Sequence, residues 1–291
     1  MTNFIKNTRY PYSGINSRNI YEWPNKTKLA VYIGLNLEHF SFGRGLGAEL
    51  VPSHGDAPDI LNYAWRDYGN RVGAWRLGSL FNELEIPVSL LINTAVYDYC
   101  PELVSAFRDS GAEIVAHGRT NSEYQGDLSE KQEMQLISET TSRITKEEGK
   151  PPKGWLGPWI SESNITPDLL HETDYTYILD WCHDDQPTWI KTRNGKLLSV
   201  PYPQELNDIP AIISRKNSAE QFSKMIIDNF DEMLEQSNSQ PLVMGIALHA
   251  YIVGQPFRLR EIRKALKHIS MHRDQIWLST SGDIASHAAK K

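Results

Sequence analysis

The chain has 291 residues, a formal net charge of −6 and a sequence pI of about 5.9, which excludes the strongly basic surface of a nucleic-acid-binding protein. It is long enough to bury a large core without disulfides, and its two cysteines match neither a disulfide framework nor a zinc-ribbon pattern. No apolar run approaches the roughly 18 residues of a membrane span, and the N-terminus lacks the apolar segment of a signal peptide. We therefore expect a cytoplasmic protein whose partners include neither nucleic acid nor a membrane.

Residues 1–27 are polar and aromatic, and they predict an N-terminal arm in front of one catalytic domain at residues 28–291. We interpret the arm as an extended segment that packs on the body. It is either a surface tail or a segment that covers a neighbouring subunit. We expect a homo-oligomer that acts on a small-molecule substrate.

Strands and helices alternate about seven times along the rest of the chain. Apolar runs predict strands at residues 28–40, 87–93, 112–116, 155–159, 175–181, 197–200, 242–251 and 276–279. Amphipathic patterns predict helices at 68–85, 100–110, 129–148, from 166, and at 218–236, 258–269 and 282–291. This alternation is typical of an α/β fold with a parallel sheet, and the length favours a closed barrel over an open sheet.

Residues 41–67 are rich in Gly and Pro and predict a long loop. Long loops in compact domains are usually functional or disordered. Because this loop contains Tyr63, Trp65 and His54, we expect it to be ordered over the site.

Four of the predicted strands end in titratable residues. One ends at His117, one at Asp180 and one at His249, and the first strand ends at the pair Glu38-His39. Parallel α/β folds place their chemistry at the carboxyl ends of their strands. The four strand ends therefore predict an enzyme.

Each of these side chains has a plausible role in hydrolysis. His117 is placed for metal ligation or proton transfer, and His249 for protonation of a leaving nitrogen or oxygen. Glu38 is a candidate general base or metal ligand, and His39 is a candidate ligand. Neighbours on a strand face opposite sides, so we expect only one of Glu38 and His39 in the pocket.

The segment DWCHDDQPTW, residues 180–189, is the densest polar and aromatic cluster. Asp184 and Asp185 are expected to bind a polar substrate, to hold an arginine or to cap a turn, and Asp180 is the stronger candidate. Asn121 follows His117 by four residues, where a second histidine would make a good metal signature, but an amide is a poor zinc ligand. We expect Asn121 to contact the substrate. Tyr251 is expected to shape the pocket.

Several of these motifs resemble those of a known family. EIVAHGRTN, residues 113–121, resembles the central His motif of the polysaccharide deacetylase (NodB-homology) family. The order of the other motifs is similar: an acidic first-strand end, a Gly-Pro-Trp loop ending at Trp159, the Asp180-Trp181 strand end and the late Leu248-His249. RDYGNRVGAWRL (66–77) and His54-Gly55-Asp56 resemble the branch of allantoinases and cyclic imide hydrolases. The resemblance covers roughly residues 28–280.

The resemblance implies a single-domain, distorted (β/α)7 barrel. Sugar-acting members of the family hold zinc or a similar metal with one Asp and two His, use an adjacent Asp as base and use the late His as acid. In this chain the paired Asp residues are replaced by Leu37-Glu38 and the second His by Asn121, so only His117 and His249 carry over. Either the metal is lost, or the site is rebuilt with Glu38, His39 or His54. The expected cofactor is a divalent metal, with zinc favoured, or none.

We thus expect a hydrolase that opens the carbon–nitrogen bond of a cyclic imide, a ureide or a similar small cyclic amide. Glu38 serves as base or metal ligand, His117 holds a metal or polarises the carbonyl, and His249 is the acid; Asp180, Asp184, Trp159 and Trp181 contact the substrate. One alternative is a metal-dependent deacetylase of a carbohydrate or small N-acyl compound, which an open groove favours over a pocket roofed by residues 41–67. Another is a catalytically inactive barrel that binds a ligand.

Overall fold

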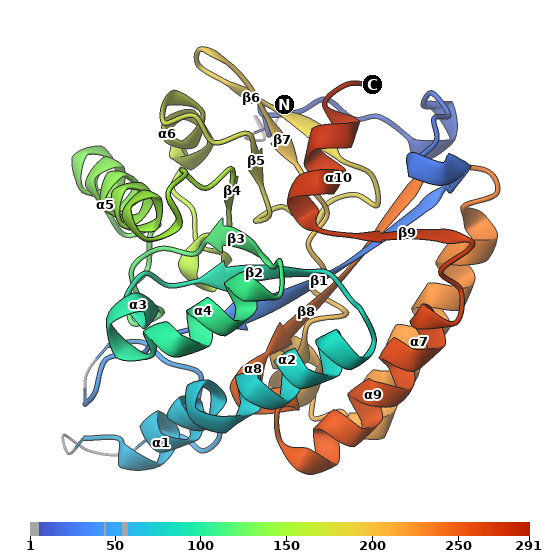
Figure 1. The fold of residues 1–291 in the computed structure, drawn as a ribbon. Coiled ribbons are helices and arrows are strands. Elements are labelled where there is room, and N and C mark those ends of the chain that lie inside the picture. The colour runs from blue at the N-terminus through green and yellow to red at the C-terminus, as the bar shows by residue number, and fades with distance from the viewer. Residues whose placement is uncertain (1–5, 44, 54–57) are drawn as a thin grey trace, which may run out of the picture.

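The computed structural model describes residues 6–43, 45–53 and 58–291. Its centre is a curled sheet with the strand order β6-β7-β5-β4-β3-β2-β1-β8, and β9 pairs with β1 (Figure 1). The strands are β1 (Leu29–Leu37), β2 (Val88–Ile92), β3 (Glu113–Ala116), β4 (Gly154–Trp155), β5 (Tyr177–Ile178), β6 (Thr188–Thr192), β7 (Gly195–Ser199), β8 (Leu242–His249) and β9 (Ile276–Ser279). The paired strands run parallel except β6 and β7. The predicted α/β class is therefore confirmed.

Helices pack on the outside of this sheet, and α7 and α9 lie side by side (Figure 1). The α-helices are α1 (Ile60–Tyr68), α2 (Ala74–Glu83), α3 (Val96–Tyr99), α4 (Pro101–Asp109), α5 (Glu130–Glu148), α6 (Thr166–Glu172), α7 (Ala219–Gln236), α8 (Ala250–Val253), α9 (Pro256–Ser270) and α10 (Ser281–Ala288). Shorter 3₁₀ or π segments are η1 (Ile15–Ser17), η2 (Pro24–Lys26), η3 (Gly69–Gly73), η4 (Pro158–Ile160) and η5 (Ile209–Ser214). None of the helices in the described ranges is both long and apolar enough to cross a membrane.

Strand β1 is the centre of the core because every one of its nine residues is buried. A strand that is covered on both faces is expected to be almost continuously apolar, and the run LAVYIGLNL has that character. β1 pairs with β8 along its whole length, with β2 at its carboxyl half and with β9 at its amino half. The carboxyl ends of β1, β2, β3 and β8 thereby meet at one edge of the sheet.

We expected a closed barrel, but in the part of the chain that the structure describes no strand ladder joins the two outer strands, β6 and β8. Instead, irregular chain meets the outer edge of β8: the Val243 N–H donates to the carbonyl of Asp185 at 2.8 Å, and the Ala247 N–H donates to that of Leu206 at 3.0 Å. Asn207 forms an isolated parallel bridge with Ala247. The sheet is therefore a distorted (β/α) barrel whose seam is made by the segments around Asp185 and Asn207.

Two predicted boundaries are wrong for identifiable reasons. The helix expected at 68–85 begins at Ile60 and continues through the π turn η3 into α2, so the loop before it is shorter than expected. A Cβ on Gly73 would lie 2.1 Å from the Ala250 carbonyl oxygen, so this glycine allows α8 to approach the turn. The strand expected at 155–159 stops at Trp155, because Trp159 takes a left-handed backbone conformation with φ of 64°.

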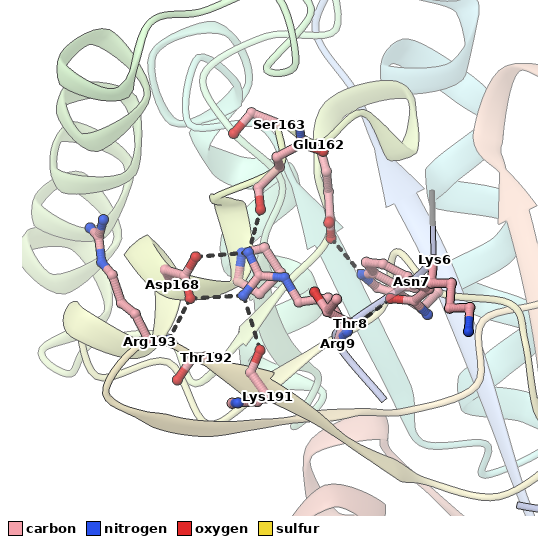
Figure 2. Close-up of a pocket in the computed structure, with 13 residues that line it drawn as sticks. Lys6, Asn7, Thr8, Arg9, Glu162, Ser163, Asp168, Lys191, Thr192 and Arg193 are labelled. Atoms are coloured by element: carbon pink, nitrogen blue, oxygen red, sulfur yellow. Dashed lines mark hydrogen bonds and ion pairs between the residues drawn. The ribbon is translucent and has the colours of Figure 1, made fainter. Parts of the chain in front are cut away.

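The N-terminal arm packs on the body of its own chain. Arg9 forms an ion pair with Asp168 at 2.7 Å, and its backbone carbonyl accepts a hydrogen bond of 2.7 Å from the Lys191 N–H. Arg9, Asp168 and Lys191 are among the residues that line a cavity of ≈670 Å³. Figure 2 shows the contacts of Arg9 with the other two. Further along the arm, Trp23 is 2% exposed and its Nε1 donates to the Leu242 carbonyl at 3.1 Å.

We expect Trp23→Phe to lower the free energy of unfolding by about 1–3 kcal/mol, because it leaves the buried Leu242 carbonyl without the indole donor. Urea denaturation followed by fluorescence or circular dichroism measures this change. Tyr12→Phe is the matched control, since Tyr12 is 96% exposed. Equal stabilities for the two variants would contradict a structural role for Trp23.

Candidate active site

The carboxyl ends of β1, β3 and β8 surround a cavity of ≈150 Å³. Glu38 follows β1, His117 follows β3 and His249 ends β8, so the strand order places the carboxylate between the two imidazoles. The remaining lining residues are Asn36, Phe40, Asn121, Leu156, Trp159, Ile160, Tyr202, Gln204, Asn207, Ile209, Pro210 and Tyr251. No described residue of 41–67 lines this cavity, so the expected roof does not come from that part of the loop.

Glu38 is the centre of the cluster. Its Oε1 lies 3.5 Å from His117 Nε2 and 3.4 Å from His249 Nε2, and it accepts a hydrogen bond of 2.6 Å from Asn121 Nδ2. Its Oε2 accepts a hydrogen bond of 3.1 Å from the Tyr251 hydroxyl. Burial disfavours the charged form, but the charge of the His249 imidazolium lowers the pKa of Glu38 to about 2. Glu38 is therefore a carboxylate at neutral pH.

His249 is held from behind by the buried carboxylate of Asp208. Its Nδ1 lies 2.6 Å from Asp208 Oδ1, and its backbone N–H donates to Asp208 Oδ2 at 2.8 Å. Burial opposes protonation, but Asp208 and Glu38 together raise the pKa of His249 to about 10. The ring is therefore an imidazolium at neutral pH, with its Nε2 hydrogen directed into the cavity.

In a neutral His117 the cavity-facing nitrogen carries no hydrogen, in contrast to Nε2 of His249. Its Nδ1 lies 2.8 Å from the Leu156 carbonyl, and because a carbonyl only accepts, Nδ1 carries the hydrogen. Nε2 then presents a lone pair toward Glu38 Oε1. The two acceptors can share a donor such as a hydroxyl group or a water molecule.

The residues at this site do not fit the zinc centre that the resemblance implies. Asn121 presents its amide nitrogen to Glu38, so no oxygen of Asn121 faces the cluster, and His249 is engaged as an imidazolium between Glu38 and Asp208. Among the described residues, only His117 Nε2 and Glu38 Oε1 remain as converging ligands, whereas catalytic zinc uses three protein ligands. Within residues 6–43, 45–53 and 58–291, no group of three His, Cys, Asp or Glu side chains is arranged to hold a metal.

Two of the candidate metal ligands are not brought to this cavity. His39 lies in a separate small pocket with Tyr63, Asp67 and Tyr99, and its ring meets the edge of the Tyr99 ring at 5.5 Å. Of the pair at the end of β1, only Glu38 faces the cavity. His54 lies outside the described residues.

Asp180 lies beside the cavity without lining it. Its Oδ1 accepts a hydrogen bond of 2.7 Å from the Gly157 N–H, and burial, opposed by that bond, raises the pKa of Asp180 to about 7. Trp181 turns away and donates from Nε1 to Glu162 at 2.9 Å. Asp180 therefore holds the loop that carries Trp159 into the cavity.

The adjacent carboxylates Asp184 and Asp185 also lie away from the cavity. Asp184 forms an ion pair of 2.6 Å with Arg18 of the arm and accepts from the Gln186 N–H at 3.0 Å. These contacts correspond to the alternatives of holding an arginine and capping a turn. Asp185 contributes its carbonyl to the barrel seam. Of the expected substrate contacts, the structure brings Asn121, Trp159 and Tyr251 to the site.

Sequence reasoning missed Asp208, Asn93, Asn36 and Tyr202. Asp208 lies in a Pro-rich segment outside the predicted strands and helices, where a carboxylate is normally solvated. Its only sequence signal is its position between the apolar residues Leu206 and Ile209. Asn36 donates to the Tyr202 hydroxyl at 3.0 Å, and both residues line the cavity.

Comparisons with known proteins agree with this fold. A Schizosaccharomyces pombe protein whose name assigns it to the polysaccharide deacetylases is 25% identical over 90% of this chain and 91% of its own. A probable polysaccharide deacetylase from Pseudomonas aeruginosa PAO1 superposes with a TM-score of 0.86 at 26% identity, over 97% of this chain and 99% of its own. Puue allantoinase superposes with a TM-score of 0.84 at 24% identity, over 96% and 97%. No protein-family model matches the chain.

Proposed function

Because the chain belongs to the polysaccharide deacetylase (NodB-homology) family and is a hydrolase of carbon–nitrogen bonds, we propose that its substrate is a small cyclic imide, ureide or related cyclic amide. The observation that carries the proposal is a ≈150 Å³ cavity with one carboxylate between two imidazoles. A cavity of about this volume accommodates a single benzene-sized ring. The fold shared with an allantoinase, an enzyme of a cyclic ureide, supports the same substrate class.

In this mechanism Glu38 and His117 activate water. A water molecule between Glu38 Oε1 and the His117 Nε2 lone pair donates a hydrogen bond to each of them. As its oxygen forms a bond to the carbonyl carbon, one proton passes to Glu38. The pKa of about 2 makes Glu38 a weak base in the resting site. Its uptake of a proton is therefore coupled to the loss of the His249 proton to the substrate, which removes the neighbouring positive charge.

His249 completes the reaction as the acid. The tetrahedral intermediate collapses, the carbon–nitrogen bond breaks, and the electron pair on the departing nitrogen takes the Nε2 proton of His249. Glu38 then returns a proton to the imidazole. Because the substrate is cyclic, water opens the ring and the new carboxyl and amide groups stay in one product molecule. Asp208 fixes the His249 ring throughout.

A deacetylase of a carbohydrate or small N-acyl compound is the second candidate, because the curated relatives carry deacetylase names. The volume of the cavity argues against a saccharide chain, since sites for drug-sized ligands are about 300–1,000 Å³. The two candidates also differ in metal use, because family members that act on sugars hold a metal and the residues of this site do not fit one.

The decisive experiment assays hydrolysis of succinimide, hydantoin, dihydrouracil and allantoin beside N-acetylglucosamine oligomers, with elemental analysis before and after EDTA. We expect ring opening of at least one cyclic substrate at a rate that EDTA does not change, because Glu38, His117 and His249 supply the base, the contact to water and the acid. Release of acetate, together with metal-dependent activity, would support the deacetylase. No turnover of either class would support an inactive ligand-binding barrel.

A further inference from the structure

We propose that Asn93 is a positioning residue that fixes which side of the Asn121 carboxamide faces Glu38, and that it thereby excludes a divalent metal from the site. Asn93 is the first residue after β2 and is completely buried. The proposal rests on the proposed function in treating Glu38 as the working carboxylate. Its test depends on metal binding and does not require turnover.

The orientation of the Asn93 carboxamide is determined by two backbone groups. The His39 N–H donates to Asn93 Oδ1 at 2.9 Å, and Asn93 Nδ2 donates to the carbonyl of His117. A backbone N–H can only donate and a carbonyl can only accept. A flipped Asn93 would lose both bonds, so its oxygen and nitrogen are assigned without ambiguity.

This orientation is passed on to Asn121. Asn93 Nδ2 lies 3.1 Å from Asn121 Oδ1, so Asn121 accepts on that side and must direct its own Nδ2 to Glu38, 2.6 Å away. The backbone of Asn121 is held as well: its N–H donates to the His39 carbonyl at 3.0 Å, and Trp159 Nε1 donates to its carbonyl at 2.7 Å. The side chain therefore has little freedom to turn.

The direction of these bonds decides the chemistry of the site. A donor facing Glu38 makes a charge-assisted hydrogen bond that favours the carboxylate. An oxygen in the same place would instead repel the carboxylate. It would also stand beside His117 Nε2 and Glu38 Oε1 as the third ligand of a divalent metal that accepts an amide oxygen. Asn93 therefore selects a hydrogen-bonded carboxylate over a metal centre.

Asn93→Asp is expected to reverse the hydrogen bonds from Asn93 to Asn121 and from Asn121 to Glu38, with almost no change in side-chain volume. One carboxylate oxygen still accepts from the His39 N–H. The other cannot donate to the His117 carbonyl, which loses its donor, and instead accepts from Asn121, so the Asn121 oxygen turns toward Glu38. We expect one equivalent of Co²⁺ to bind this variant, detected by calorimetry and by cobalt absorption bands without substrate, whereas the wild type binds none. Without metal, kcat/KM falls about 10- to 100-fold, because a hydrogen bond to a charged group is lost.

Two further variants separate this effect from a general perturbation. Asn82→Asp adds the same charge at an exposed position of α2 and should bind no Co²⁺. In an Asn121→Leu background, Asn93→Asp should confer no Co²⁺ binding, because the carboxamide that turns is absent. Cobalt binding by the wild type, binding that persists without Asn121, or a folded Asn93→Asp protein that binds none would each overturn the proposal.

If Asn93→Asp fails to fold, the wild type still provides a test. The Asn121 carboxamide protons are identified in NMR spectra by their absence from Asn121→Leu, and we expect slow exchange with solvent because they donate to a buried carboxylate. Exchange at the rate of an exposed asparagine would overturn the proposal. Absence of turnover on every cyclic substrate, with the cobalt results as expected, would instead refute the proposed function and leave the role of Asn93 standing.

Discussion

Glu38→Gln is expected to lower kcat by about 10²- to 10⁴-fold on whichever substrate the wild type hydrolyses, because the amide cannot take a proton from water. The substitution keeps the volume of the side chain and leaves an oxygen that can accept from Asn121 Nδ2. It also removes the negative charge that helps to hold His249 as an imidazolium. KM should change less than kcat, since the proton transfer is needed only in the transition state.

Initial rates at several substrate concentrations, with a circular dichroism spectrum of each protein, check this expectation. Glu102→Gln is the matched control, because Glu102 is exposed on α4 and should retain full kcat. A Glu38→Gln protein within about threefold of the wild type would remove Glu38 from the mechanism and make the His117 and His249 pair the only acid–base groups left to consider.

The carboxyl ends of parallel strands could be located from the sequence because a buried parallel strand is a nearly continuous apolar run. Glu38, His117 and His249 end or follow three such runs. β1 lies next to β8 and is separated from β3 only by β2, so the three side chains meet in one cavity. Asp180 satisfies the same rule by sequence but follows β5, which has only two residues. Its carboxylate accepts a hydrogen bond from the Gly157 N–H, and no local sequence pattern predicts that bond.

Other parts of the site depend on tertiary contacts that leave no periodic signal. Asp208 comes from irregular chain at the seam of the barrel, where polar residues normally predict a solvated loop. Trp159 reaches the cavity because its backbone is left-handed, a conformation that costs about 1–3 kcal/mol for such a residue. The directions of the bonds from Asn93 to Asn121 are set by two backbone groups that are distant in sequence.

The substitution at position 121 shows how a resemblance and a structure complement each other. From the sequence, Asn121 indicates only that a histidine of the family motif is missing. In the structure the amide is a hydrogen-bond donor to Glu38, and our proposal for Asn93 and Asn121 gives it a task other than metal ligation. The distinction between a damaged metal site and a rebuilt acid–base site lies in that one hydrogen bond.

Asp208→Asn is expected to lower kcat by about 10²- to 10⁴-fold and to move the alkaline limit of activity to lower pH. His249 acts as an acid only while it is protonated, so activity is lost as the pH rises through its pKa. In the wild type Asp208 and Glu38 raise the pKa of His249 to about 10, which keeps the acid protonated at neutral pH. Without the Asp208 charge, only Glu38 still favours the imidazolium, while burial continues to disfavour it.

A pH profile of kcat distinguishes this electrostatic role from a loss of structure. A variant damaged only in packing would lose rate equally at every pH, whereas loss of the Asp208 carboxylate should leave its largest residual activity on the acidic side. Asp283→Asn on α10 changes charge far from the cavity and should keep the wild-type profile. An unshifted alkaline limit in Asp208→Asn would mean that the limit belongs to another group, and His249 would then lose its assignment as the acid.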